Sequence, residues 1–175
     1  MTDGDLGRPT PCDEFDVAAL RGHLLAVMSR IARIGEVGDV AGEASIVDAV
    51  PAEDWSAAWA EAAHRAQRAW ADEARLDATV TVPWAQLPGR IALAIYTSEI
   101  TVHTWDLLVA IGRAAAFDDR VVEMCLASMR FGLPAEGRDD GITPFASVVS
   151  VSDDAPLIDQ LVAWTGRNPA WLAAA

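Results

Sequence analysis

The sequence predicts an all-α fold of four main helices, and three observations support this class. Alanine supplies much of the 52% hydrophobic content, and alanine loses no side-chain entropy in a helix. Apolar residues recur at three- and four-residue steps over several long segments, which is the period of an amphipathic helix. Proline and glycine stand mainly between these segments. A chain of 175 residues is expected to form one domain, residues 1–175.

The first helix is predicted over about residues 16–35. It follows a lead-in rich in glycine, proline and aspartate, and Asp13 or Asp16 suits its N-terminal cap. Leu20, Val27 and Ile31 form its apolar stripe, and His23 lies within that stripe. This helix is therefore expected to point a histidine toward the core.

A second helix is predicted over about residues 52–74, with three tryptophans on its apolar face. His64 lies on the opposite, charged face, which excludes it as a partner of His23. The alternating, β-branched segment Thr79–Pro83 predicts a short extended connector, too short to define a sheet.

The third helix is expected over about residues 88–112 and the fourth over about 118–133. The fourth should turn five residues inward: Val121, Val122, Cys125, Leu126 and Met129. Further on, residues 145–151 are predicted to be extended, and a short terminal helix is predicted over about 156–166.

Charge and composition exclude several classes of function. The net charge is −13 and all 13 basic residues are arginine, so nucleic acid is not an expected partner. The chain has no long apolar run, and its N-terminus is acidic where a signal peptide is basic, so a cytoplasmic protein without membrane contact is expected. Cys12 and Cys125 are too few for a disulfide framework, and Cys12 is interpreted as a packing residue rather than a nucleophile.

The third helix carries the pattern that predicts chemistry. Glu99 and His103 are four residues apart, so both side chains lie on one helix face and can reach one ion. Tyr96 and Asp106 share that side, which is expected to face inward. The opposite side should carry the polar residues Thr97, Thr101 and Thr104.

A buried carboxylate and imidazole need a hydrogen-bonded network or a cation. His23 is the natural third ligand from a second helix. Two histidines and one carboxylate leave coordination positions open, which is typical of catalytic zinc, although nickel, iron and manganese accept the same ligands. The alternative is that these histidines are ordinary hydrogen-bonded core residues.

Two further residues on this face are candidates for catalytic roles. Asp106 is placed to orient a ligand imidazole or to hold a bound water, and a simple hydrogen bond on the helix face is the alternative. Tyr96, the single tyrosine, is placed to donate to a substrate or to satisfy a buried carbonyl.

Several segments together resemble a known family. They are Thr10–Val17, Leu20 with His23–Leu24, Val82–Pro83, Leu87–Gly89, Glu99 and His103 with Thr104–Leu107, Asp153–Pro156 and Gly166–Pro169. This set is similar to the metal-binding domain of mycothiol-dependent maleylpyruvate isomerases, within the DinB-like superfamily. Phe15 stands where relatives often have tryptophan, and the second domain of the two-domain isomerases has no counterpart in these residues.

The resemblance implies a DinB-like four-helix bundle in which His23, Glu99 and His103 hold a divalent metal, most often zinc. It further implies an enzyme that uses mycothiol, a low-molecular-weight thiol, either in transfer to a small electrophilic substrate or in isomerisation of that substrate. The resemblance also implies a homodimer. Two other functions remain open at this point. One is a metal-dependent hydrolase assisted by Asp106; the other is a non-catalytic module with Trp84, Trp164 and Trp171 at an interface.

Overall fold

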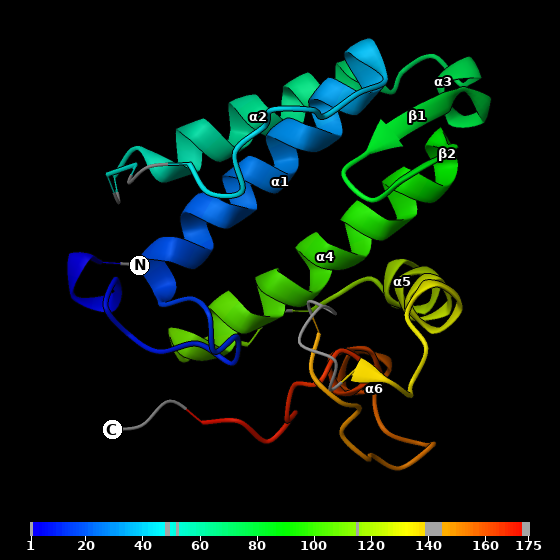
Figure 1. The fold of residues 1–175 in the computed structure, drawn as a ribbon. Coiled ribbons are helices and arrows are strands. Elements are labelled where there is room, and N and C mark those ends of the chain that lie inside the picture. The colour runs from blue at the N-terminus through cyan, green and yellow to red at the C-terminus, as the bar shows by residue number, and fades with distance from the viewer. Residues whose placement is uncertain (1, 48–49, 52, 115, 139–144, 173–175) are drawn as a thin grey trace.

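The computed structural model describes residues 2–47, 50–51, 53–114, 116–138 and 145–172, and most of that chain is helical (Figure 1). In chain order, the α-helices are α1 (Val17–Val37), α2 (Trp55–Ala69), α3 (Ala74–Asp77), α4 (Gly89–Ala110), α5 (Asp119–Gly132) and α6 (Leu157–Trp164). A 3-10 turn, η1 (Asp3–Asp5), precedes them. Within the described residues, the paired strands are β1 (Thr79–Val82) and β2 (Ala85–Pro88).

Helix α4 is the central element of the fold. Helix α1 packs against α4 on one side and against α2 on the other, while α5 packs between α4 and α6. Figure 1 shows α1 and α2 side by side above α4, with α5 and α6 beyond α4's opposite side. Two helices on different sides of α4 therefore bury more than one of its faces.

Helix α1 begins and ends close to its predicted bounds. The Asp16 side chain accepts a hydrogen bond from the Ala19 amide at 2.8 Å, which caps the first turn. Gly38 ends the helix with φ +78°, a conformation that glycine adopts without a steric penalty. Leu20, Val27 and Ile31 are buried as expected.

Helix α2 is shorter than predicted, because it ends at Ala69 rather than near residue 74. Asp72 accepts a hydrogen bond from the Ala74 amide at 3.0 Å, and this local bond starts the separate short helix α3. The predicted start at residue 52 lies outside the described residues. His64 is exposed, as its position on the charged face predicted.

The prediction that Thr79–Pro83 is too short to define a sheet was wrong. Residues of β1 pair with β2 in an antiparallel register that sets Thr79 opposite Pro88 and Val82 opposite Ala85. The tight reversal between these strands places β2 in a segment that showed no alternating pattern. Because Val80 and Val82 on β1 pack into the core, the small sheet is anchored to the helices.

Three further expectations need correction. Thr101 is buried, because α5 covers the α4 face that was predicted to be polar; its hydroxyl donates to the Thr97 carbonyl and lies 3.6 Å from the Cys125 sulfur. Val121 on α5 is exposed, whereas the other four predicted inward residues are buried. Residues 145–151 form no strand: the Val149 amide donates to the Ala163 carbonyl at the end of α6 instead.

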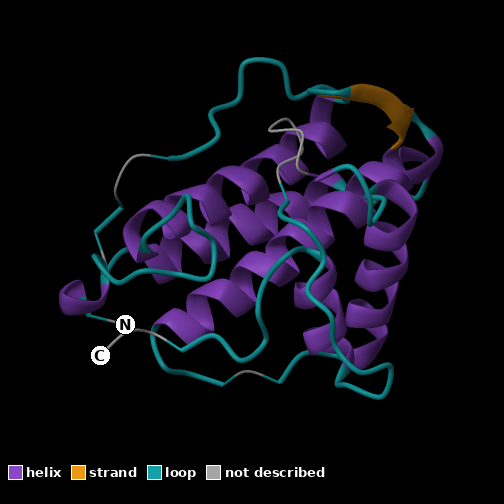
Figure 2. Ribbon diagram, turned by 60° about the horizontal axis from the view of Figure 1, so that its bottom comes forward, coloured by secondary structure: helices purple, strands orange, loops and turns teal. Residues whose placement is uncertain are grey.

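Seen with its lower side turned forward, the described chain is made mostly of helices, and its strands lie together at one corner (Figure 2). Among the described helices, none has both the length and the apolar character needed to span a membrane.

Candidate metal centre

The structure brings together the three residues that the sequence predicted as metal ligands. His23 comes from α1, while Glu99 and His103 come from successive turns of α4. One ligand atom from each residue lies within 4.8 Å of the others. His23 and His103 are only 7% and 6% exposed, and Glu99 is half-buried. The group therefore lies between two packed helices and remains partly open through Glu99.

Each histidine has one ring nitrogen fixed by a hydrogen bond to an oxygen acceptor. Nδ1 of His23 lies 2.9 Å from the Ser45 carbonyl oxygen, and Nδ1 of His103 lies 3.0 Å from a carboxylate oxygen of Asp106. A carbonyl oxygen or an ionised carboxylate can only accept, so both Nδ1 atoms must carry the proton and donate. In a neutral imidazole, this leaves Nε2 as a bare lone pair.

The lone-pair side of His23 meets a carboxylate. Nε2 of His23 is 3.1 Å from Oε1 of Glu99, so two acceptor atoms face one another when the imidazole is neutral. The ring of His103 is 4.9 Å from the ring of His23, nearly perpendicular to it. An added proton or a cation between these atoms satisfies both acceptors. The donor set matches a divalent transition metal, because such ions bind neutral imidazole and carboxylate.

The backbone position of Ser45 depends on Gly22 of α1. A Cβ atom at residue 22 would overlap the Val47 carbonyl oxygen, so only glycine lets this loop lie against the helix. The Val47 amide donates to the Gly22 carbonyl at 3.2 Å. Arg30 also holds the loop, since its guanidinium donates to the Ala44 carbonyl at 2.9 Å. These contacts present the Ser45 carbonyl to His23.

A second hydrogen-bond network fixes His103. The Asp106 carboxylate is fully buried and accepts from His103 through Oδ2. The guanidinium of Arg167 donates to both Asp106 oxygens, at 3.4 and 3.2 Å. Arg167 is itself 7% exposed and also donates to the Thr165 carbonyl at 2.8 Å. Asp106 is therefore a buried carboxylate with both oxygens engaged.

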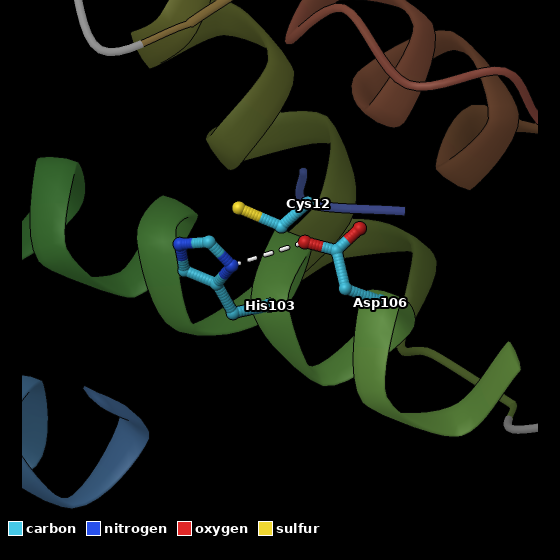
Figure 3. Close-up of side chains that lie close together, drawn as sticks. All are labelled: Cys12, His103 and Asp106. Atoms are coloured by element: carbon cyan, nitrogen blue, oxygen red, sulfur yellow. Dashed lines mark hydrogen bonds and ion pairs between the residues drawn. The ribbon is translucent and has the colours of Figure 1, made fainter. Parts of the chain in front are cut away.

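Cys12 lies beside His103 and Asp106. Its sulfur, a nitrogen of His103 and an oxygen of Asp106 form another group of potential metal ligands within 4.8 Å of one another. Figure 3 shows the Cys12 side chain next to His103, with the bond from His103 to Asp106 dashed. Burial raises the pKa of the Cys12 thiol, which disfavours the thiolate that metals bind. The protein's own hydrogen bonds already satisfy Asp106, so the group with His23 and Glu99 is the better metal site.

Tyr96 lies one turn before Glu99 and is almost completely buried. Its hydroxyl has no hydrogen-bond partner among the described residues. Burial, with a smaller contribution from the negative charge of Glu99, raises the pKa of Tyr96 to about 12. The hydroxyl is thus a protonated, unused donor near the candidate ligands.

Sequence reasoning missed three contributors to this site. Phe15 stacks on the His23 ring at 4.9 Å between ring centres, Ser45 accepts from His23, and Arg167 pairs with Asp106. Phe15 and Arg167 both belong to segments that carried the family resemblance, but periodicity cannot pair a lead-in or a C-terminal residue with a helix face. Ser45 acts through its backbone carbonyl, which leaves no pattern in side-chain types.

The fold and the site define a mostly helical protein in which two helices bring histidine and carboxylate side chains together as candidate metal ligands. The chain belongs to the mycothiol maleylpyruvate isomerase N-terminal domain family, whose model matches residues 1–108. The matched part contains all three candidate ligands and Asp106, and ends before Arg167.

Two curated relatives come from Mycobacterium tuberculosis, one from strain CDC 1551 and one from strain H37Rv, and both are described as uncharacterised proteins. Each is 29% identical over 164 residues, which is 93% of this chain and 85% of the relative. No solved structure matches the chain significantly.

Proposed function

We propose that this protein is a divalent-metal-dependent enzyme that uses a low-molecular-weight thiol, mycothiol, in transfer to or isomerisation of a small electrophile. The proposal rests on the way hydrogen-bond acceptors face one another in the site. Both imidazoles use Nδ1 as a donor, and Nε2 of His23 faces the Glu99 carboxylate. The family contributes the expectation of mycothiol. We also propose that the four long helices form a DinB-like bundle.

In this proposal, His23, Glu99 and His103 hold the metal, most often zinc. When bound, such an ion supplies Lewis-acid chemistry that favours the deprotonated form of a thiol beside it. Three protein ligands leave a coordination position for that thiol. The burial of both histidines and the cover of Phe15 limit the access of water from their side.

Asp106 acts in this proposal as a positioning residue. By accepting from Nδ1 of His103, it fixes the ring's tautomer and orientation so that Nε2 is the ligand atom. Arg167 balances its charge and holds the carboxylate in place. Because both oxygens of Asp106 are engaged, no free carboxylate remains there to act as the general base of a hydrolase. This observation favours the thiol chemistry over the hydrolytic alternative.

Tyr96 is proposed as a donor to the bound substrate or thiol. Its hydroxyl is buried beside Glu99, protonated at neutral pH and without a partner among the described residues. A buried donor without a partner costs about 1–3 kcal/mol, and a ligand oxygen that accepts its proton removes that cost. Tyr96 would then contribute to ligand binding without changing the metal.

The first experiment measures metal content. Protein purified without chelator should carry close to one zinc, nickel, iron or manganese ion per chain by elemental analysis, and His23→Ala should carry almost none. His64→Ala is the matched control, because it removes an exposed imidazole from α2. Equal metal content in wild type and His23→Ala would remove this site from the proposal.

The second experiment tests catalysis. Metal-loaded protein should accelerate the reaction of mycothiol with small electrophiles, and chelated protein should not. If the metal is bound at these residues but mycothiol and other thiols give no metal-dependent rate, the chain is a metal-binding module without thiol chemistry.

A further inference from the structure

A cleft of about 600 Å³ opens at the C-terminal end of α4. Its walls come from that helix end, the segment that follows it, α6, the lead-in and the C-terminal segment; they include Arg8, Trp105, Leu108, Arg113, Phe117 and Trp171. In Figure 1 this helix end lies between the blue N-terminal and the red C-terminal segments. The cleft shares no lining residue with the candidate metal centre, and its volume is in the range that small molecules occupy.

The walls of the cleft are apolar and rest on packed core. Phe117 and Ile158 pack against the cluster that contains Val102 and Leu126. Trp171 packs against a different cluster, which contains Leu20 and Leu107. The cleft therefore lies where two hydrophobic clusters meet, with aromatic rings from different segments held by both. Aromatic surfaces of this kind bind flat apolar groups.

The charge of the cleft is opposite to that of the chain. Acidic residues outnumber basic residues by 26 to 13 overall, yet among the described residues the ionisable side chains that line the cleft are those of Arg8 and Arg113. Arg8 pairs with Asp5 at 3.2 Å. The Arg113 guanidinium has no ion pair or hydrogen bond with any residue in the described part of the chain. One guanidinium that has no counter-charge among the described residues thus lines the same cleft as the aromatic side chains.

We propose that this cleft binds a small aromatic carboxylate. The aromatic walls would take up the ring, and Arg113 would pair with the carboxylate, a planar group that matches the guanidinium fork. Because Arg8 already pairs with Asp5, Arg113 is the one lining guanidinium without an ion pair among the described residues, which suits a monoanion better than a multiply charged phosphate. The proposal is independent of the metal centre and of thiol chemistry.

Calorimetric titration of the full chain with 2-naphthoate and its neutral counterpart 2-naphthamide tests the proposal. The two ligands have the same ring and differ in charge. Wild type should bind the carboxylate about tenfold more tightly, as a charged hydrogen-bonded pair implies. Arg113→Ala should abolish that preference and leave the affinity for the amide nearly unchanged. Arg120→Ala, which removes an exposed arginine of α5 outside the cleft, should behave as wild type.

Further titrations show where the ligand binds. Ala114→Trp should weaken both ligands by filling the cleft, since Ala114 is an exposed lining residue. His23→Ala and chelated wild type should bind 2-naphthoate as untreated wild type does. Equal affinity for the two ligands, a preference that survives Arg113→Ala, no binding at all, or binding that requires the metal would each overturn the proposal. The Arg113→Ala result decides the question even if Ala114→Trp does not fold.

Discussion

Tyr96 makes the stability of this protein depend on pH at the alkaline end. Its pKa is raised to about 12 from an ordinary value of 10.0, mainly by burial. Below pH 10 both the folded and the unfolded chain keep the phenol proton. Between pH 10 and 12 the unfolded chain releases it and the folded chain does not, so the free energy of unfolding falls by up to roughly 1.4 kcal/mol per pH unit.

Urea unfolding at several pH values checks this expectation, and Tyr96→Phe should show a much flatter dependence. The chain suits the measurement, because it has one tyrosine and no lysine. Cys12, whose pKa is also raised by burial, contributes a slope of the same sign that begins near pH 9. The absorbance of the single phenolate gives the folded-state pKa directly, and an ordinary value there would contradict the burial argument.

Asp106→Asn is expected to weaken metal binding by about 10–100-fold, the usual effect of removing a carboxylate that orients a ligand histidine. It should also destabilise the chain by about 3–5 kcal/mol, because Arg167 is then left buried without a counter-charge. Competition with a chromogenic chelator measures the affinity, and urea unfolding measures the stability.

Glu123→Gln is the control for Asp106→Asn, since it neutralises an exposed acid of α5. An Asp106→Asn protein that keeps wild-type metal affinity would show that Asp106 does not position His103. Adding Arg167→Gln to Asp106→Asn should recover part of the lost stability but not the metal affinity, which separates the two roles of the carboxylate.

For single residues, the sequence was sufficient to predict which way a side chain points when that direction depends only on the helix repeat. The spacing of Glu99 and His103, the inward position of His23 and the outward position of His64 follow from 100° steps along single helices. The contacts of Arg167 with Asp106 span 61 residues, and the acceptor at Ser45 is a backbone atom. Neither can be read from residue types, because both depend on how separate segments pack.

At the scale of elements, Gly22→Ala tests how the loop at residues 45–47 supports helix α1. Helix propensity alone predicts that alanine stabilises α1 by about 1 kcal/mol. We expect the opposite, because the new methyl group would overlap the Val47 carbonyl and push the loop away. His23 then loses its acceptor at Ser45, so both the free energy of unfolding and the metal affinity should fall.

Gly132→Ala is the matched control for this prediction. Gly132 ends α5 and a Cβ there meets nothing within 4 Å, so alanine should add up to about 1 kcal/mol of stability and leave metal binding unchanged. If Gly22→Ala behaves like Gly132→Ala, the loop does not restrain His23.

Among the helices and strands, too, some could be predicted from the sequence and others could not. Long amphipathic helices such as α1 and α5 were predictable within a few residues, because their burial repeats over several turns. The hairpin of β1 and β2 was not, since β2 shows no alternation and its pairing depends on the reversal after Pro83. Helix α4 was placed correctly, but the burial of Thr101 was not predicted, because a helix covered on two sides lacks a polar stripe.

For the whole molecule, removal of the metal is expected to lower the melting temperature without unfolding the chain. The hydrophobic clusters found in the described part of the chain contain none of the candidate metal ligands. An ion at 100 times its dissociation constant adds about 2.7 kcal/mol, which corresponds to about 5–10 °C for a chain of this size.

Circular dichroism melts with and without chelator measure this shift. The helical signal at low temperature should be the same in both samples, and His23→Ala should show no shift on chelation. Loss of the helical signal on chelation would mean that the ion is required for folding rather than added to a folded site.

The pairing of Arg167 with Asp106 also bears on the order in which the site is completed as the chain is synthesised. Translation runs from the N-terminus, and folding can begin on the emerging segments. Helices α1 and α4, with His23, Glu99 and His103, therefore leave the ribosome well before Arg167. Until the segment after α6 docks, Asp106 has no counter-ion and His103 is held by an unbalanced carboxylate. The candidate ligands are thus available early, but the Asp106–Arg167 pair behind His103 forms only when the C-terminal segment is in place.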